Sequence, residues 1–531
     1  MYLYDEVARF HPDPALAQWL AEVVQPLLDQ RQQAQQKLSD TTLELSRTAH
    51  ELSLAELKIQ ALTLELAHHK RMRFGHKAES FSPEQRELFE ESATADLAAI
   101  GAELEALAPK PTVPRAARPR GRQTLPAELP RIEHRHEPEA CTCGQCGAHL
   151  TLIGEDVSEQ LDVEPARFFV HRHIRPQYAC RSCETVSAAP LPPAVIEGSL
   201  AAPGLLAWVV TQKYLGPLPL YRVEAISARN GVALARSTLA AWVGRIGVAV
   251  APLAQRLAEH LKASAVLHAD ETPVPQLDPG RGSTRRATLW AYSNNRLAQG
   301  PPIVVFDYQP TRGGQHAQDF LAGWRGTLMV DDYAGYKALF AGGEVIELGC
   351  WAHARRKFFD LQAAQPHPRA ALALAKIGEL YAIERDARAL SSQARAALRQ
   401  DEAQPRLAAL YSWLFDTRSA VAPGSGMAKA IDYTLKRWTA LVRYADSGEL
   451  PIDNNPIENA IRPIALGKKN WLFAGSERAG QRAAAIQSLL ATARLNGIEP
   501  YAWLKATLEK LPTWPHRRLD ELLPLRQSMP Q

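Results

Sequence analysis

The chain has 531 residues, of which 46% are hydrophobic and 22% charged, and its formal net charge is only +4. This length exceeds what one hydrophobic core supports, so we expect several domains, and the weak net charge leaves any nucleic-acid affinity to local basic clusters. No uninterrupted apolar run reaches the roughly 18 residues that a membrane-spanning helix requires, and the first residues lack a basic-then-apolar leader, so the sequence predicts a cytoplasmic protein outside the membrane.

The N-terminal part of the chain is predicted to be helical over residues 1–29 and a leucine-zipper-like coiled coil over residues 30–77. Apolar residues recur at every seventh position in a stretch without proline or glycine, which favours self-association. These residues are Leu38, Leu45, Leu52, Ile59 and Leu66. The companion row of apolar positions is thin, so a single amphipathic helix on a globular body is the alternative.

The coiled coil ends in a basic cluster that includes Arg71 and Arg73 and is a candidate phosphate-binding segment. Residues 78–130 are predicted to be an acidic and then basic linker. Its part over residues 110–130 is dense in proline and arginine, a composition that cannot bury enough apolar surface to fold alone. Within it, Arg120 and Arg122 belong to a Pro-Arg-Gly-Arg run of the kind that follows an AT-rich minor groove. Solvated charge is the alternative for both basic segments.

Residues 131–195 are predicted to be a zinc-binding module that recognises DNA. Two Cys-x2-Cys pairs fit one tetrahedral zinc site, and a filled four-cysteine sphere makes that Zn²⁺ ion structural. The four predicted ligands are Cys143, Cys146, Cys180 and Cys183, with Cys141, His149 and His173 as alternatives. Two short strands are expected over 157–165 and 168–178, and their basic face includes the candidate DNA contacts Arg172 and Arg175.

Residues 196–262 are predicted to be helical, with helices over 204–214, 220–230 and 237–260. Ser237 is a candidate N-cap of the third helix. The second and third helices are close enough in sequence to form a helix-turn-helix, and packing of three helices without DNA is the equal alternative.

Short β-rich runs follow Ala265, at 266–272, 288–292 and 303–307, and a helical stretch then leads into a further strand. This is the opening order of a ribonuclease-H-like fold, in which the first strand lies beside the strand after the helix. That arrangement brings Asp270 together with one of the adjacent acids Asp331 and Asp332. Paired carboxylates at strand ends suit divalent cations, which take oxygen ligands.

A third acid is expected near the start of a later helix. Asn454 or Asn455 is suited to capping that helix, with Pro456 in its first turn. Glu458 then lies in the first turn, and Arg462 lies one turn later on the same face. A surface ion pair between Glu458 and Arg462 is the alternative.

Several long motifs occur together and in order. They are residues 267–274 (LHADETPV), 331–336 (DDYAGY), 350–358 (CWAHARRKF), 453–463 (DNNPIENAIRP) and 468–476 (KKNWLFAGS). Together they resemble the large transposase of the insertion-sequence family numbered sixty-six, and the likeness spans nearly the whole chain. The resemblance implies a DDE-type transposase, nucleoid-associated in the cytoplasm, that binds the terminal repeats of its element and carries out metal-dependent cleavage and strand transfer.

The resemblance also implies the site residues. Asp270, Asp331 and Glu458 would form the catalytic triad and hold two Mg²⁺ (or Mn²⁺) ions. Cys350 and His353 are similar to a Cys-x2-His pair seen beside the second acid in several DDE families. Because two ligands make only half a zinc sphere, we expect this pair to position or pack rather than to bind metal. Candidate phosphate contacts are Arg355, Arg356, Lys357, Arg462, Lys468 and Lys469.

The predicted fold class is multidomain α+β: a ribonuclease-H-like α/β catalytic core, a four-cysteine zinc module and an N-terminal coiled-coil helix. The catalytic domain is expected over 263–480 with a helical insertion at 359–450, and a C-terminal helical region over 481–531. Expected partners are DNA, both terminal repeats and target, and a second copy of the chain; accessory proteins of the same element stay open. The alternatives are a catalytically inactive zinc-containing DNA-binding protein or repressor, and a ribonuclease-H-like nuclease.

Overall fold

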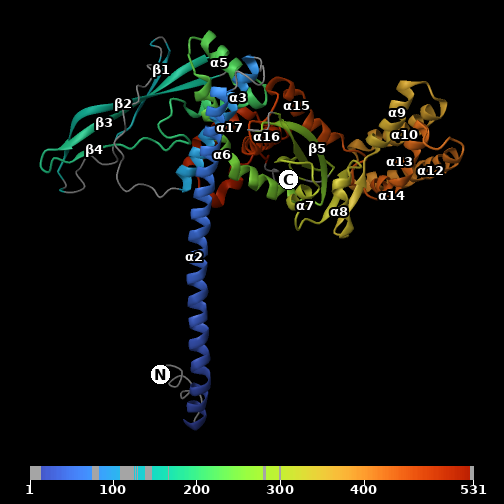
Figure 1. Cartoon of the computed structure of the whole chain (residues 1–531), viewed down its shortest axis with the longest axis horizontal. Helices are drawn as coiled ribbons and strands as arrows, with labels where there is room; N and C mark the ends of the chain where they lie inside the picture. Colours follow the sequence, from blue (N-terminus) through green and yellow to red (C-terminus); the bar gives the residue numbers. More distant parts are fainter. Residues whose placement is uncertain are drawn as a thin grey trace. The chain divides into compact units, whose positions relative to one another are not determined.

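A computed structural model describes most of the chain (Figure 1). The described residues are 14–74, 83–107, 129–137, 148–164, 167–278, 283–297 and 300–526, with residues 125, 127 and 146. They belong to two compact units. The first comprises Met1–Arg73 with Ile100–Ala116, and the second comprises Phe74–Ala99 with Ala117–Gln531.

The N-terminal helix α2 runs without interruption over Pro14–Phe74, so no element boundary separates the two N-terminal segments predicted from the sequence. Its heptad residues point into solvent: Leu45 is 63% exposed and Leu52 is 61% exposed. A row of large apolar side chains on one helix face is the surface that a coiled-coil partner covers. Self-association through α2 stays a prediction.

Replacing Leu45 and Leu52 by lysine is expected to keep the full-length protein monomeric, because each new charge would lie in the apolar interface of the coiled coil. The measurement is sedimentation equilibrium across a range of concentrations. The matched control is Ser39→Lys with Ser46→Lys, which adds the same charge at the same spacing on another exposed face of α2. A parent protein that is already monomeric at high concentration would contradict the coiled-coil prediction.

The predicted linker over 78–130 contains a helix, α3 at Pro83–Leu107, which the composition of the segment did not indicate. The part of α3 that belongs to the second unit buries two acids there, and each meets a cation from a distant helix. The pairs are Glu91 with Lys213 and Asp96 with Arg482. A buried carboxylate is tolerated only when it is paired, and here the partners are supplied by tertiary structure that the local sequence does not reveal.

The cysteine-containing segment forms one sheet in which β3 is central. Its strands are β1 Arg131–Arg135, β2 Leu150–Glu164, β3 Arg167–Cys180 and β4 Val186–Ala188. β2 and β3 form a long antiparallel hairpin, while β1 pairs with β3 in parallel and β4 pairs with it antiparallel. The hairpin is longer than the two predicted short strands, and its far end carries Cys180.

Helices pack around this sheet and the next one. They are α4 Pro203–Tyr214, α5 Leu220–Arg229, α6 Arg236–Lys262, α16 Glu477–Leu495 and α17 Pro500–Lys510. Of these, α6 and α16 contact the second sheet, and α4 contacts the first. The predicted Ser237 cap is wrong, because α6 starts one residue earlier, after Ala235, and has no side-chain cap. By length and composition α6 resembles a membrane span, but 56% of its most apolar window is buried inside the protein, as in a core helix.

The second sheet has five strands in the order β7-β6-β5-β8-β9. They are β5 Val266–Gln276, β6 Arg285–Asn294, β7 Val304–Gln309, β8 Gly326–Val330 and β9 Val345–Gly349. β5, β6 and β7 pair antiparallel, whereas β5 and β9 each pair in parallel with β8. The predicted adjacency of the first strand and the strand after the helix is therefore confirmed.

Helices fill the rest of the second unit, and the segment predicted as a helical insertion is helical. They are α7 Gln315–Phe320, α8 Lys337–Ala341, α9 Trp351–Ala364, α10 Pro368–Asp386, α11 Ser392–Leu398, α12 Gln404–Ser419, α13 Gly426–Lys436, α14 Trp438–Val442 and α15 Asn455–Trp471. Short 3-10 or π turns are Ala334–Tyr336, Ala387–Ala389, Arg399–Ala403, Arg443–Asp446, Leu511–Thr513 and His516–Leu522. The inserted helices share one apolar core with β8, β9 and α9.

Candidate active site and zinc site

Two of the predicted acids lie on neighbouring strands. β5 and β8 run in parallel with Leu267 beside Leu328 and His268 beside Met329. Continuing this register by two residues places Asp270 beside Asp331. Burial, together with the negative charges of Glu271, Asp331 and Glu458, raises the pKa of Asp270 to about 7. A cation bound next to Asp270 would stabilise its ionised carboxylate, which burial and the neighbouring acids disfavour.

The neighbouring acid Asp332 is engaged elsewhere. Its Oδ1 accepts a hydrogen bond of 2.6 Å from Arg437, whose side chain is only 7% exposed. The same guanidinium lies 2.8 Å from Glu347 Oε1. Arg437 therefore ties the inserted helices to the ends of β8 and β9, and Asp332 is a structural partner in that contact. Asp331 instead accepts the N–H of Tyr333 at 2.8 Å, and its charge acts on Asp270.

Glu458 comes from α15, in the first turn as predicted. Asn454 is the N-cap residue of this helix by position, but its side chain does not cap it. Sequence reasoning missed what the amide does: Asn454 Nδ2 donates to Ala269 O at 2.8 Å, and Asn454 Oδ1 accepts from His268 Nδ1 at 2.9 Å. Burial lowers the pKa of His268 to about 4, so the ring is neutral and carries one proton. Asn454 thus fixes α15 to β5 next to Asp270.

Asn454→Ala is expected to destabilise the protein by about 2–4 kcal/mol, because Asn454 is fully buried and its loss leaves buried partners on β5 without hydrogen bonds. Urea unfolding followed by tryptophan fluorescence measures the change. Asn455→Ala is the matched control, since Asn455 is exposed and bonds only Asp453 among the described residues. Equal stability of the two variants would show that Asn454 does not hold α15 in place.

A fourth acid, Glu271, was also missed as part of the site. Its side chain is 3% exposed and pairs with Arg312, with Oε1 3.0 Å from Arg312 Nε. Tyr336 donates its hydroxyl proton to Glu271 Oε2 at 2.9 Å. Glu271 is therefore already neutralised by the protein, unlike Asp270, whose carboxylate accepts the Glu271 backbone N–H. The adjacency of the two acids in sequence did not distinguish these roles.

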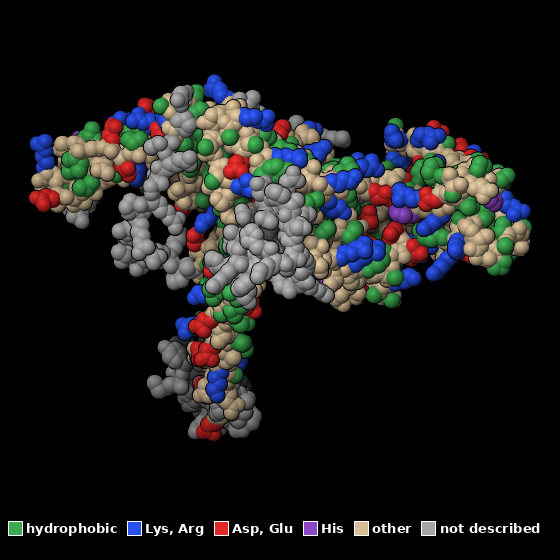
Figure 2. Space-filling model, turned by 45° about the horizontal axis from the view of Figure 1, so that its top comes forward, with side chains coloured by type: hydrophobic (Ala, Val, Ile, Leu, Met, Phe, Trp, Pro, Cys, Tyr) green, Lys and Arg blue, Asp and Glu red, His purple; other side chains and the backbone are tan. Residues whose placement is uncertain are grey.

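The predicted phosphate contacts fall into three groups. Those exposed on α9 and α15 are Arg355, Arg356, Lys357, Arg462 and Lys469, of which Arg356 also lies 3.9 Å from Glu458 Oε2. Those already paired within the protein are Arg172 with Glu133, Arg175 with Asp156, and Lys468, which donates to Thr272 Oγ1 and Pro273 O. The side chains of Arg71, Arg73, Arg120 and Arg122 lie outside the described residues. Figure 2 shows Lys and Arg interspersed with Asp and Glu on one face, rather than one continuous basic field.

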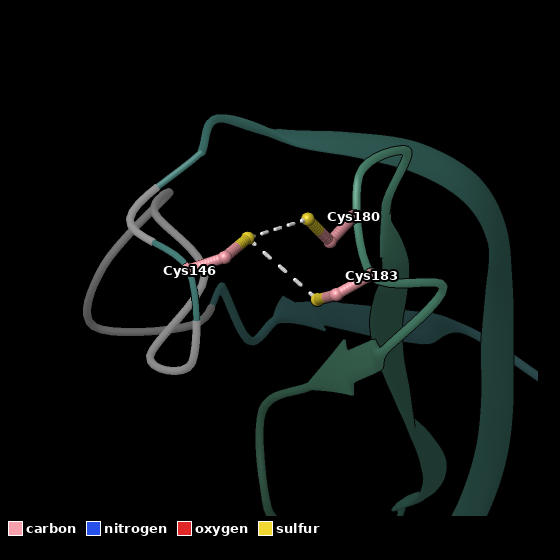
Figure 3. Close-up of side chains that lie close together, drawn as sticks. All are labelled: Cys146, Cys180 and Cys183. Carbon is pink, nitrogen blue, oxygen red and sulfur yellow. Dashed lines mark hydrogen bonds between the residues drawn. The ribbon is translucent and has the colours of Figure 1, made fainter.

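Three of the four predicted zinc ligands lie together at the end of the hairpin (Figure 3). Cys146 Sγ is 3.3 Å from Cys180 Sγ and 3.7 Å from Cys183 Sγ. These separations fit sulfurs around one ion with Zn–S bonds of about 2.3 Å. The hydrogen bond with Cys146 is the main cause that lowers the pKa of Cys180, which favours the thiolate. Cys143, the fourth predicted ligand, lies outside the described residues.

Four family models match successive parts of the chain, and all four describe transposases or their parts. Residues 198–482 match the model described as "Transposase IS66 family", and residues 140–184 match the "zinc-finger binding domain of transposase IS66". Residues 488–525 match the "IS66 C-terminal element", and residues 61–133 match the "Transposase C of IS166 homeodomain". The zinc-finger match contains the three clustered cysteines, which supports zinc as the metal of that cluster.

Similar proteins occur in Sinorhizobium fredii (strain NBRC 101917 / NGR234). Uncharacterized protein y4qI is 39% identical over 418 residues, covering 76% of this chain and 77% of its own length. Uncharacterized protein y4jD is 38% identical over 409 residues, covering 74% and 80%, and uncharacterized protein y4hP is 36% identical over 407 residues, covering 73% of each. The family model spans more than half of the chain and carries both the acids and the inserted helices. The chain therefore belongs to the IS66 family of transposases and contains that family's zinc finger.

Proposed function

We propose that this transposase cuts DNA at the ends of its element and joins the freed ends to target DNA, using Asp270, Asp331 and Glu458 to hold divalent cations. The observation that carries the proposal is the parallel register of β5 and β8, which, continued by two residues, brings Asp270 level with Asp331. Glu458, on the helix that Asn454 fixes to β5, is close enough for its charge to raise the pKa of Asp270.

The fold supports the same proposal. Three antiparallel strands, β7-β6-β5, continue into two parallel strands, β8-β9, with a helix between β7 and β8. This order and these directions are those expected for a ribonuclease-H-like core. Asp331 directly follows the end of β8, and Asp270 lies within β5 at the level where β8 ends.

The chemistry follows from the residues that converge there. Mg²⁺ or Mn²⁺ ions held by these carboxylates would activate a water molecule, or the 3′-hydroxyl of DNA, and would stabilise the leaving oxygen of an in-line displacement. Asp270 and Asp331 supply carboxylate oxygens from the sheet, and Glu458 supplies a third from α15. No protein nucleophile is required. The exposed cations of α9 and α15 would contact phosphates near the scissile bond.

Recognition of the ends is assigned to the zinc finger together with α4, α5 and α6. In the finger, zinc would hold the end of the β2–β3 hairpin in place. Contacts to phosphates would then fix the register of the protein on DNA, and contacts to bases would supply the sequence preference. Two DNA ends must be held together for transposition, so self-association through α2 completes the proposal.

Asp331→Asn is expected to eliminate metal-dependent cleavage of a labelled element end, while Asp332→Asn keeps cleavage within severalfold of the parent. The reason is that Asp332 is held by Arg437, so its replacement costs about 1 kcal/mol of stability and removes no metal ligand. Cleavage is quantified on denaturing gels, with thermal unfolding as the check on folding. Loss of cleavage in Asp332→Asn but not in Asp331→Asn would shift the acid assignment by one residue and refute the proposed site.

A further inference from the structure

Three side chains of the metal-ligand type meet where β9 ends and α15 begins. Cys350, His353 and Glu458 each offer one ligand atom, and the sulfur, nitrogen and oxygen lie within 4.8 Å of one another. His353 Nδ1 is 3.8 Å from Glu458 Oε1. Nitrogen and oxygen ligands of one tetrahedral ion lie roughly 3.4 Å apart, so only a small adjustment separates this arrangement from a coordination sphere.

The atoms that face each other are otherwise unpartnered. His353 Nδ1 and Glu458 Oε1 are both buried, and neither has a hydrogen-bond partner among the residues that the structure describes. Leaving a buried polar atom without a partner is unfavourable, and such atoms in a folded protein call for an explanation. A cation between them satisfies both atoms at once.

The sulfur of Cys350 is buried and accepts a backbone hydrogen bond, as a metal-bound sulfur commonly does. Cys350 is 1% exposed, and its Sγ accepts the backbone N–H of Asn454 at 3.2 Å. Burial raises the pKa of the Cys350 thiol in the metal-free fold, and the backbone N–H groups of Asn454 and His353 offset only part of that rise. Backbone donors of this kind hold a ligand sulfur in place from outside the coordination sphere.

We propose that Cys350, His353 and Glu458 bind one divalent cation of the zinc class, with the fourth position open to water. A thiolate and an imidazole select Zn²⁺ or Co²⁺ over Mg²⁺, which prefers oxygen ligands. The site is separate from the zinc finger. The sequence motif contains only Cys350 and His353, and folding brings the third ligand, Glu458, next to them from α15.

This cation would act on the orientation of Glu458. Ligation of Oε1 would tie the Glu458 carboxylate to His353 of α9, while Oε2 lies 3.9 Å from Nη2 of Arg356 on the same helix. If the proposed function holds, one residue then serves two cations of different chemistry, and occupancy by zinc sets how Glu458 is presented to Asp270. That consequence rests on the proposed function, whereas binding of the cation does not.

The test is the zinc content of the full-length protein, measured by elemental analysis after dialysis against excess Mg²⁺. The parent is expected to retain about two zinc ions per chain, one in the finger and one here, and His353→Ala and Cys350→Ser about one each. Reloading with Co²⁺ should give a sulfur-to-cobalt charge-transfer band that weakens in Cys350→Ser. His316→Ala is the control for loss of a half-buried histidine, and Asp270→Asn is the control for loss of a nearby carboxylate; both variants should keep two zinc ions.

A parent that holds a single zinc ion, or a His353→Ala protein that still holds two, would overturn the inference. Because Cys350 is buried, the zinc content of Cys350→Ser is informative only if its thermal unfolding matches that of the parent. If it does not, His353→Ala is the deciding variant, because its side chain is 22% exposed and its loss should disturb the fold less. Metal content is independent of DNA cleavage. A parent with two zinc ions and no cleavage would leave this site standing and refute the proposed function.

Discussion

Asp270→Asn is expected to lower metal-dependent cleavage by about 10³-fold or more, equivalent to about 4 kcal/mol of transition-state stabilisation, while binding to the element end stays within severalfold of the parent. The change keeps the shape of the side chain and removes the charge that would hold a cation. Glu458→Gln should behave in the same way. Single-turnover cleavage and gel-shift titration on the same labelled end measure the two properties separately.

The control for this pair is Asp360→Asn, an exposed carboxylate on α9 outside the cluster. A second effect is expected in the protein without DNA. Burial raises the pKa of Asp270 to about 7, above its unfolded value, so the ionised carboxylate destabilises the metal-free fold as pH rises through that range. Asp270→Asn should remove this penalty and unfold no more easily than the parent. Cleavage by Asp270→Asn within tenfold of the parent would remove Asp270 from the site.

Cys180→Ser is expected to unfold the zinc finger and abolish binding to the element end. Structural zinc supplies on the order of 10 kcal/mol of folding free energy in small modules, and a weakened coordination sphere forfeits much of it. Cys180 is 1% exposed and lies at the end of the β2–β3 hairpin, so the defect should spread along that hairpin. Zinc content, limited proteolysis between β1 and β4, and gel-shift titration report the three consequences.

Ser182→Ala, an exposed change in the same turn, is the matched control and should retain zinc and DNA binding. If Cys180→Ser keeps its zinc and resists proteolysis, then Cys180 is not a ligand. If it loses zinc but still binds the element end with parental affinity, then end recognition lies outside the finger, and the helices α4–α6 become the recognition surface.

Patterns that repeat within a short stretch of sequence predicted their part of the structure well. The seven-residue spacing gave a long helix, and the spacing of the cysteines gave a cluster in which Cys146, Cys180 and Cys183 meet. The order of strands and helix predicted that β5 and β8 are neighbours. Each of these predictions rests on a simple pattern: a seven-residue repeat, a spacing between cysteines, or the order of strands and helix along the chain.

Contacts between distant segments could not be read in the same way. Asn454 looked like a helix cap because capping is the common local use of asparagine, yet its amide bonds β5 instead. Arg437 shows no signal in its own segment, and its role appears only where α13 meets the end of β8. The segment 78–130 was predicted to be a linker, yet its acids Glu91 and Asp96 are buried and have tertiary partners. Buried polar groups chosen by long-range partners are therefore what sequence periodicity misses.

The central claim is that this transposase cuts and joins DNA through Asp270, Asp331 and Glu458. The most direct measurement incubates the full-length protein with a labelled element end, a target plasmid and Mg²⁺, and resolves cleaved and joined products. The account predicts both products with the parent, and neither when Mg²⁺ is chelated or when Asp270→Asn is used. Tight binding with no product under any metal would instead indicate a DNA-binding repressor, cleavage without joining would indicate a nuclease, and either result would contradict the account.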